Sequence, residues 1–203
     1  MTKLLYKKNF NEVVSLLLNE EVVAFPTDTV FGIGVIYTSG KAVDKMKLAK
    51  GRDASKPFPL MVASSDQVEE VAYIGERERV ILEEFSPGAI TLVLKRKDTV
   101  CKEFVNGFDT VAIRIPDDAY VLRLLKKVGP MFVTSANLSG EPAANTHEEV
   151  LQQLDGRIAG VVRGKSFSHI ASTIVDCTGS ELKCLREGEI SFDDILWEVD
   201  NAG

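Results

Sequence analysis

Two polar loops, each directly after a short apolar run, constrain this chain more than any other feature. The runs at 22–25 (VVAF) and 131–134 (MFVT) are typical of buried strands, and they open into 26–34 (PTDTVFGIG) and 135–140 (SANLSG). In open α/β sheets, ligands bind beyond the ends of strands. Pro, Thr, Asp and Gly also favour ordinary turns, so the first loop can equally be interpreted as a plain turn. The Gly-Ile-Gly of the first loop is too weak a signal for a dinucleotide fingerprint.

Short apolar runs alternate with amphipathic stretches along the chain, which predicts a fold of strands and helices. The predicted strands are 4–6, 22–25, 60–62, 90–94, 110–116, 131–134, 160–162, 172–176 and 182–185. The predicted helices are one after Asn9, then 42–49, 68–72, 76–85, 120–128 and 146–154, and one after Ser191. Two pairs have the spacing of a capping box, Asn9 with Glu12 and Thr146 with Glu149. Ser191 is predicted to cap the last helix. No repeat or linker interrupts this pattern, which predicts one domain over residues 1–203.

The loop KGRDASKPFP, residues 50–59, places Lys50, Arg52 and Lys56 within seven residues. Its prolines bias the residues before them toward extended backbone, so the loop is not helical. Such a cluster is often plain solvated surface. A cationic loop restrained by prolines also matches a polyanion, because Arg offers a fork for phosphate oxygens and Lys a mobile point charge. Alone, the loop indicates a polyanionic ligand, such as a nucleotide, and leaves the surface interpretation open.

Arg114 is the other conspicuous cation, because it stands between two isoleucines in the predicted strand 110–116. A strand arginine normally lies on the solvated face, since arginine is seldom buried without a partner. The alternative is a clamp for a carboxylate or a phosphate.

Composition excludes several classes of protein. The chain has 203 residues and a formal net charge of −6, which argues against broad electrostatic adhesion to nucleic acid or anionic membrane. Three cysteines without CxxC spacing predict neither a disulfide framework nor a zinc site, and two histidines make a histidine metal centre improbable. No apolar run has the length of a signal peptide or a membrane span, which predicts a cytoplasmic protein without membrane association.

Four separated stretches together resemble one family, the YrdC-like threonylcarbamoyl-AMP synthases. They are PTDTVFGIG, KGRDASKP, VAIRIP with SANLSGEPAANT, and ASTIVDCT with LREGEI, in the family's order. Each stretch alone is weak, whereas the combination of KxR…KP with SxN is specific. The resemblance implies an α/β (α+β) fold, a twisted, mixed, open sheet with flanking helices around a large basic cavity. It also implies the short, single-domain type of the family.

The resemblance implies an activity as well. Members condense L-threonine, bicarbonate and ATP into threonylcarbamoyl-AMP and pyrophosphate, for the N6-threonylcarbamoyl modification of adenosine at position 37 of tRNA. Downstream partners would be the proteins that transfer the threonylcarbamoyl group to tRNA. No residue stands out as a catalytic base, and the reaction needs none if threonine's amine captures CO2 and the carbamate attacks the α-phosphate. Mg²⁺ is expected to accompany ATP, but no acidic cluster predicts a metal site on the protein.

The family's binding residues carry over position by position. The positions that match ATP contacts are Lys50, Arg52, Lys56, Thr110, Ser135, Asn137, Asn145 and Arg186. The positions that match threonine contacts are Thr29, Arg114 and Ser172, with Arg114 as the clamp for the carboxylate. Many relatives have Tyr where this chain has Phe31, and some have His where it has Ala63. These two departures bear on amino-acid selectivity.

Two rival hypotheses remain from the sequence. One is a module that binds double-stranded RNA or tRNA, which the net negative charge disfavours. The other is a paralogue that adenylates a different carbamoylated substrate, since a fold does not fix a function.

Overall fold

The computed structural model describes residues 1–51, 57–166, 168 and 170–202. Within this part of the chain the strands are β1 (Lys3–Leu5), β2 (Val23–Phe25), β3 (Gly32–Ile36), β4 (Leu60–Met61), β5 (Ile90–Lys95), β6 (Thr110–Arg114), β7 (Met131–Ser135), β8 (Gly160–Val162), β9 (Thr173–Asp176) and β10 (Lys183–Arg186). The helices are α1 (Phe10–Leu18), α2 (Gly40–Lys50), α3 (Ser65–Val71), α4 (Glu76–Phe85), α5 (Ala119–Val128), α6 (His147–Leu154) and α7 (Phe192–Asn201). Two short 3₁₀ turns, η1 (Lys7–Asn9) and η2 (Lys102–Val105), complete the described elements.

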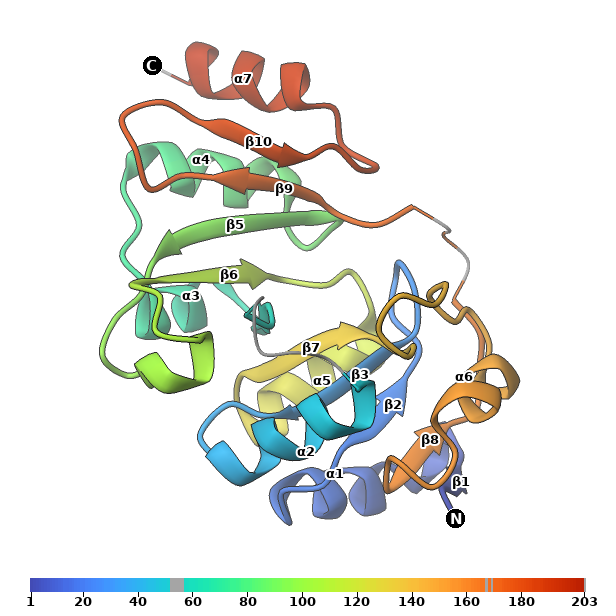
Figure 1. Cartoon of the computed structure of the whole chain (residues 1–203). Coiled ribbons are helices and arrows are strands. Elements are labelled where there is room, and N and C mark those ends of the chain that lie inside the picture. Colours follow the sequence, from blue (N-terminus) through green and yellow to red (C-terminus); the bar gives the residue numbers. More distant parts are fainter. Residues whose placement is uncertain (52–56, 167, 169, 203) are drawn as a thin grey trace.

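The described strands form one mixed sheet in the order β1-β8-β2-β3-β7-β4-β6-β5-β9-β10. The pairs β1/β8, β2/β8, β4/β6 and β5/β9 are parallel, and the other neighbours are antiparallel. Figure 1 shows the sheet twisting from β1 near the N-terminus to β10 near the C-terminus. The predicted twisted, mixed sheet with flanking helices is confirmed.

Helices cover both faces of the half of the sheet that holds β2, β3 and β7. Strand side chains alternate between faces. Val23 and Phe25 pack in one apolar cluster with α1 and α5, whereas the alternate residues Val22 and Ala24 pack in the other cluster with α2. Figure 1 shows α1, α2 and α5 grouped around these strands. Two-sided burial explains why the strand at 22–25 is a continuous apolar run in the sequence.

The other half of the sheet, from β6 to β10, has one covered face and one more open face. The strand register assigns each residue to one of the two faces, because paired residues on neighbouring strands point to the same face. The buried face packs toward α3 and α4 and carries Ile90, Leu92, Leu94, Val111, Ile113 and Val175. The opposite face carries Thr91, Val93, Thr110, Ala112, Arg114 and Ile174. A half-sheet whose second face carries polar side chains and no covering helix among the described elements is suited to line a ligand site.

Four local predictions need correction. Residues 32–34, expected to belong to the polar loop 26–34, instead begin strand β3, because Gly32 and Gly34 allow close packing against Val133 and Phe25. Asn9 does not cap α1, since its Oδ1 accepts a hydrogen bond from Tyr6 N.

The other two concern the later helices. Thr146 caps α6 through Glu149 N, but the Glu149 carboxylate returns to Asn145 N instead of Thr146 N. Ser191 makes no side-chain cap for α7, where Glu187 Oε1 accepts from Phe192 N.

None of the helices in the described ranges combines the length and the apolar character that crossing a membrane requires.

Candidate active site

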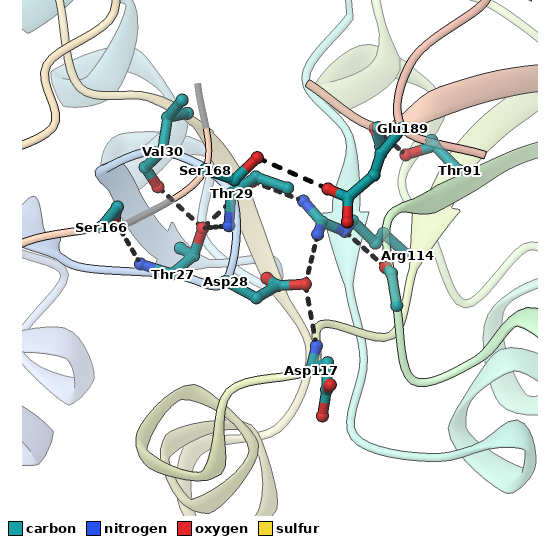
Figure 2. Close-up of polar contacts among 12 residues, drawn as sticks. Thr27, Asp28, Thr29, Val30, Thr91, Arg114, Asp117, Ser166, Ser168 and Glu189 are labelled. Atoms are coloured by element: carbon teal, nitrogen blue, oxygen red, sulfur yellow. Dashed lines mark hydrogen bonds and ion pairs between the residues drawn. The ribbon is translucent and has the colours of Figure 1, made fainter. Parts of the chain in front are cut away.

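Arg114 is the centre of a buried polar network. Its Nε donates to the Gly88 carbonyl oxygen at 3.0 Å and its Nη1 to Thr29 Oγ1 at 2.9 Å. Its Nη2 donates to Asp28 Oδ2 at 2.6 Å, and the same oxygen accepts from Asp117 N at 3.1 Å. Figure 2 shows the guanidinium between the loop that carries Asp28 and the segment that carries Glu189. The solvated-face interpretation of Arg114 is therefore wrong, because the side chain is only 7% exposed.

A donor count shows what this network leaves open. A guanidinium has five N–H groups, and the three bonds above use one each on Nε, Nη1 and Nη2. One N–H on Nη1 and one on Nη2 have no acceptor among the described residues. A carboxylate accepts charge-assisted hydrogen bonds from N–H groups of this kind.

The hydroxyl of Thr29 has a defined proton direction. Thr27 Oγ1 donates to the Val30 carbonyl oxygen at 2.7 Å, so its own proton is committed. The 3.2 Å contact between the two threonine hydroxyls must then be a donation from Thr29 to Thr27. Because Thr29 Oγ1 also receives Arg114 Nη1, it keeps one lone pair and no proton. Thr29 is thus an acceptor for any further ligand.

Asp28 was not singled out by the sequence, since an aspartate after Pro-Thr is an ordinary turn residue. Its Oδ1 is buried and has no hydrogen-bond partner among the described residues. Burial raises the pKa of the Asp28 carboxyl above its ordinary value, although the Arg114 charge and the Asp117 N–H oppose the shift. Burial also lowers the pKa of Arg114, against the Asp28 carboxylate, but an arginine stays protonated in proteins.

Ser172 and Arg186 form a second cluster on the same open face. Arg186 donates from Nε and Nη2 to the Ser172 carbonyl oxygen at 3.1 and 2.7 Å, and from Nη2 to Ser172 Oγ at 3.2 Å. Ser172 Oγ lies 2.8 Å from Thr91 Oγ1. The structure therefore joins a residue predicted to bind threonine to one predicted to bind ATP. Thr91, which no sequence motif indicated, faces the same side of the sheet as Arg114.

Gly188 fixes the geometry of this second cluster. A Cβ on Gly188 would lie 2.1 Å from the Ala171 carbonyl oxygen, so a larger residue cannot approach the strand here. Its N–H donates to Thr173 Oγ1 at 2.9 Å. The glycine in the LREGEI stretch thus has a packing reason.

Lys50, Ser135 and Asn137 come together at the loop after β7. The buried Lys50 Nζ donates to the carbonyl oxygens of Ser135 and Asn137 at 2.6 and 3.0 Å. The Asn137 side chain donates to the carbonyl oxygens of Leu138 and Glu141, which holds the loop closed. The Ser135 hydroxyl makes no hydrogen bond to the described residues. Lys50 thus fixes the shape of the SANLSG loop, and its predicted contact with phosphate stays a prediction.

The remaining predicted residues lie at different places. Asn145 is linked to the Thr27 loop through Ser166, whose N–H donates to the Asn145 carbonyl oxygen and whose Oγ accepts from Thr27 N. Thr110 begins β6 and points to the same face as Arg114, about 13 Å away along the strand. Arg52 and Lys56 lie outside the described residues.

The two family departures fall on apolar packing. Phe31 is fully buried in the core, and Ala63 packs against the cluster around α1 and α5. In the described part of the chain, no three His, Cys, Asp or Glu side chains gather as metal ligands would.

Comparison with known proteins identifies the family of this chain. The family model Sua5_yciO_yrdC, described as "Telomere recombination", matches residues 15–188. The chain belongs to this family.

Curated relatives of this family differ in length. The threonylcarbamoyl-AMP synthase of Bacillus subtilis is 38% identical over 188 residues, which cover 91% of this chain and 54% of that protein. The chain therefore spans about half the length of this relative. The threonylcarbamoyl-AMP synthase of Vibrio campbellii is 34% identical over 189 residues, which cover 89% of this chain and 100% of that protein.

A solved structure gives the same result for the fold. The crystal structure of P. abyssi Sua5 complexed with L-threonine superposes with a TM-score of 0.91 at 29% identity, covering 98% of this chain and 60% of that one.

Proposed function

We propose that this chain is an L-threonylcarbamoyladenylate synthase, a nucleotidyltransferase that forms threonylcarbamoyl-AMP and pyrophosphate from L-threonine, bicarbonate and ATP. The observation that carries the proposal is the arrangement of open hydrogen-bond donors on Arg114 and an open acceptor on Thr29. Arg114 keeps two N–H groups for a carboxylate, and Thr29 keeps one lone pair for a donor. An α-amino acid presents this combination, because its carboxylate accepts hydrogen bonds and its ammonium or hydroxyl donates them. The similar protein P. abyssi Sua5 was crystallised as a complex with L-threonine, which supports the same ligand class.

The nucleotide half of the proposal rests on the remaining polar residues. Ser135 offers a hydroxyl at the end of β7, on a loop that Lys50 and Asn137 hold in shape. Arg186 lies beside Ser172 on the same face of the sheet as Arg114, and Asn145 adjoins the Thr27 loop. We propose that these residues, with Thr110, Arg52 and Lys56, bind ATP around the predicted basic cavity.

In this proposal the protein acts by positioning and by neutralising phosphate charge. The amino-acid carboxylate binds Arg114, the carbamate forms on the amine, and its oxygen attacks the α-phosphate to release pyrophosphate. Mg²⁺ would arrive with ATP as part of the substrate. We further propose a single domain over residues 1–203, a cytoplasmic location, and downstream partners that transfer the threonylcarbamoyl group to tRNA.

Pyrophosphate release measured with one component omitted at a time tests the proposal. We expect release to require ATP, bicarbonate and L-threonine together, with threonylcarbamoyl-AMP identified by mass spectrometry. Arg79→Gln, which breaks an exposed ion pair, is the matched control and should keep wild-type turnover. Turnover that prefers another amino acid would indicate the paralogue that acts on a different carbamoylated substrate. No turnover with any amino acid would refute the synthase assignment.

A second candidate function, RNA binding, is favoured by one surface. We define the cation–ring face by Lys7, Lys8, Arg123 and Arg163 with the rings that they contact, Tyr6, Phe10 and Tyr120. Lys7 lies 5.7 Å from the Tyr120 ring and the Arg123 guanidinium 3.9 Å from the Phe10 ring. Lys8 and Arg163 both lie 5.7 Å from the Tyr6 ring. A depression of about 370 Å³ is lined by Lys7, Lys8 and Arg123, and also by the carboxylate-bearing Glu12.

These four cations make no salt bridge with any carboxylate among the described residues, although the whole chain is acidic. Cations without carboxylate partners next to aromatic rings suit a phosphate backbone. Binding of labelled tRNA and of double-stranded RNA at two salt concentrations tests this function. We expect weak, salt-dependent affinity that falls in Lys8→Glu/Arg123→Glu and is unchanged in Arg79→Gln. Equal affinity of the double variant and the wild type would refute RNA binding by this face.

A further inference from the structure

We propose that Asp28 is a positioning residue for amino-acid recognition, holding the Arg114 guanidinium so that one N–H on each terminal nitrogen stays open to the substrate carboxylate. The inference deepens the proposed function and rests on it for the identity of the substrate. Asp28 belongs to the loop after β2, whereas Arg114 ends β6 and lies 86 residues away in the sequence. Their ion pair therefore fixes two separate parts of the fold to each other.

Only one of the two carboxylate oxygens of Asp28 takes part in the ion pair with Arg114. A carboxylate and a guanidinium often form two parallel hydrogen bonds. Here only Oδ2 of Asp28 is engaged, with Arg114 Nη2 and with Asp117 N, while Oδ1 has no partner among the described residues. Arg114 Nη1 is directed to Thr29 instead. A second bond to Asp28 would occupy a donor that the substrate needs.

The unpartnered Oδ1 indicates that the arrangement is kept for a reason other than stability. A buried oxygen without a hydrogen bond is rare in native proteins and is destabilising. Asp117 N and Arg114 hold Oδ2 in place, and the Gly88 carbonyl oxygen and Thr29 hold Arg114 on its other sides. Among the described residues, Asp28 supplies the only carboxylate within ion-pair distance of this guanidinium.

Asp28→Asn tests the role, because asparagine keeps the shape and removes the charge. We expect the KM for threonine to rise about 10- to 100-fold, as for the loss of one charge-assisted contact. The KM for ATP should stay within about twofold of wild type. Asp28→Glu, which keeps the charge on a longer side chain, should recover part of the loss. Glu69→Gln breaks an exposed ion pair with Arg79 and serves as the control, with wild-type constants expected.

A second measurement does not depend on the substrate. The Arg114 Nε–H is buried against the Gly88 carbonyl oxygen, so its NMR signal should exchange slowly with solvent in the wild type. In Asp28→Asn the exchange should be at least about tenfold faster, with the backbone amides of the core still protected.

The outcomes separate the two proposals. If the wild type shows no threonine-dependent turnover, the proposed function fails, and Arg114 exchange alone decides the positioning role. An unchanged threonine KM in an active Asp28→Asn protein, or unchanged Arg114 exchange, would overturn the inference. If Asp28→Asn does not fold, Asp28→Glu decides by the same two measurements, with wild-type values overturning the role.

Discussion

Removing the Arg114 charge should destabilise the fold far more than removing a surface arginine. In Arg114→Gln the Asp28 carboxylate, whose side chain is 13% exposed, loses its cation, and Thr29 and Gly88 lose a donor. Breaking one partner of a buried ion pair typically costs about 3–5 kcal/mol. With a urea m-value of about 2 kcal/mol/M, the unfolding midpoint should fall by about 2 M.

A double-mutant cycle identifies the cause of this loss. Adding Asp28→Asn to Arg114→Gln removes the uncompensated buried charge, so the double variant should be more stable than Arg114→Gln alone. We expect a coupling energy of about 1–3 kcal/mol between the two positions. Neither variant should regain threonine affinity, because the carboxylate clamp is absent from both.

Urea unfolding followed by far-UV circular dichroism gives the free energies for all four proteins. Arg79→Gln is the control, since the Arg79 and Glu69 side chains are 47% and 43% exposed and their pair is screened by solvent. The reasoning would be refuted if Arg114→Gln lost no more stability than Arg79→Gln. Strict additivity in the cycle would show that Asp28 and Arg114 do not interact energetically.

Three further predictions concern pH, packing and the nucleotide. Burial raises the pKa of Asp28 in the folded protein above its ordinary value of 3.8, so the unfolded chain loses this proton at a lower pH than the folded protein does. The stability of the wild type relative to Asp28→Asn should therefore fall as pH rises from 3.8 through the folded pKa, and then level off. Unfolding of both proteins across pH 3–7 checks this, and a rise in relative stability would contradict it. Gly188→Ala should lose about 1–3 kcal/mol of stability by forcing backbone away from Ala171, whereas Gly179→Ala, whose nearest contact is 3.6 Å, should be neutral in thermal unfolding. Ser135→Ala should raise the KM for ATP about 2- to 12-fold and leave that for threonine unchanged, as for one neutral hydrogen bond; equal effects on both substrates would move Ser135 out of the nucleotide half.

The sequence located the candidate site better than it described the contacts there. The motif stretches pointed to Thr29, Arg114 and Ser172, and the structure brings Thr29 to Arg114 by a direct hydrogen bond. Asp28 escaped notice because an aspartate in a turn needs no partner to be explained. Strand β3 was missed for a similar reason, since glycine is a poor strand former unless a neighbouring side chain needs the space.

The sequence predicted the local structure of this chain and little of its tertiary contacts. Apolar periodicity predicted nearly every strand and helix, because side-chain spacing along 5 to 15 residues records which face is buried. Tertiary structure alone decided the order of the strands and the partner of each polar group. Thr29 and Arg114 are separated by 85 residues and Thr91 and Ser172 by 81, and no local pattern encodes such pairs. Only when the sheet forms do the loop after β2 and the end of β6 meet, and the burial that follows makes Asp28 the partner of Arg114.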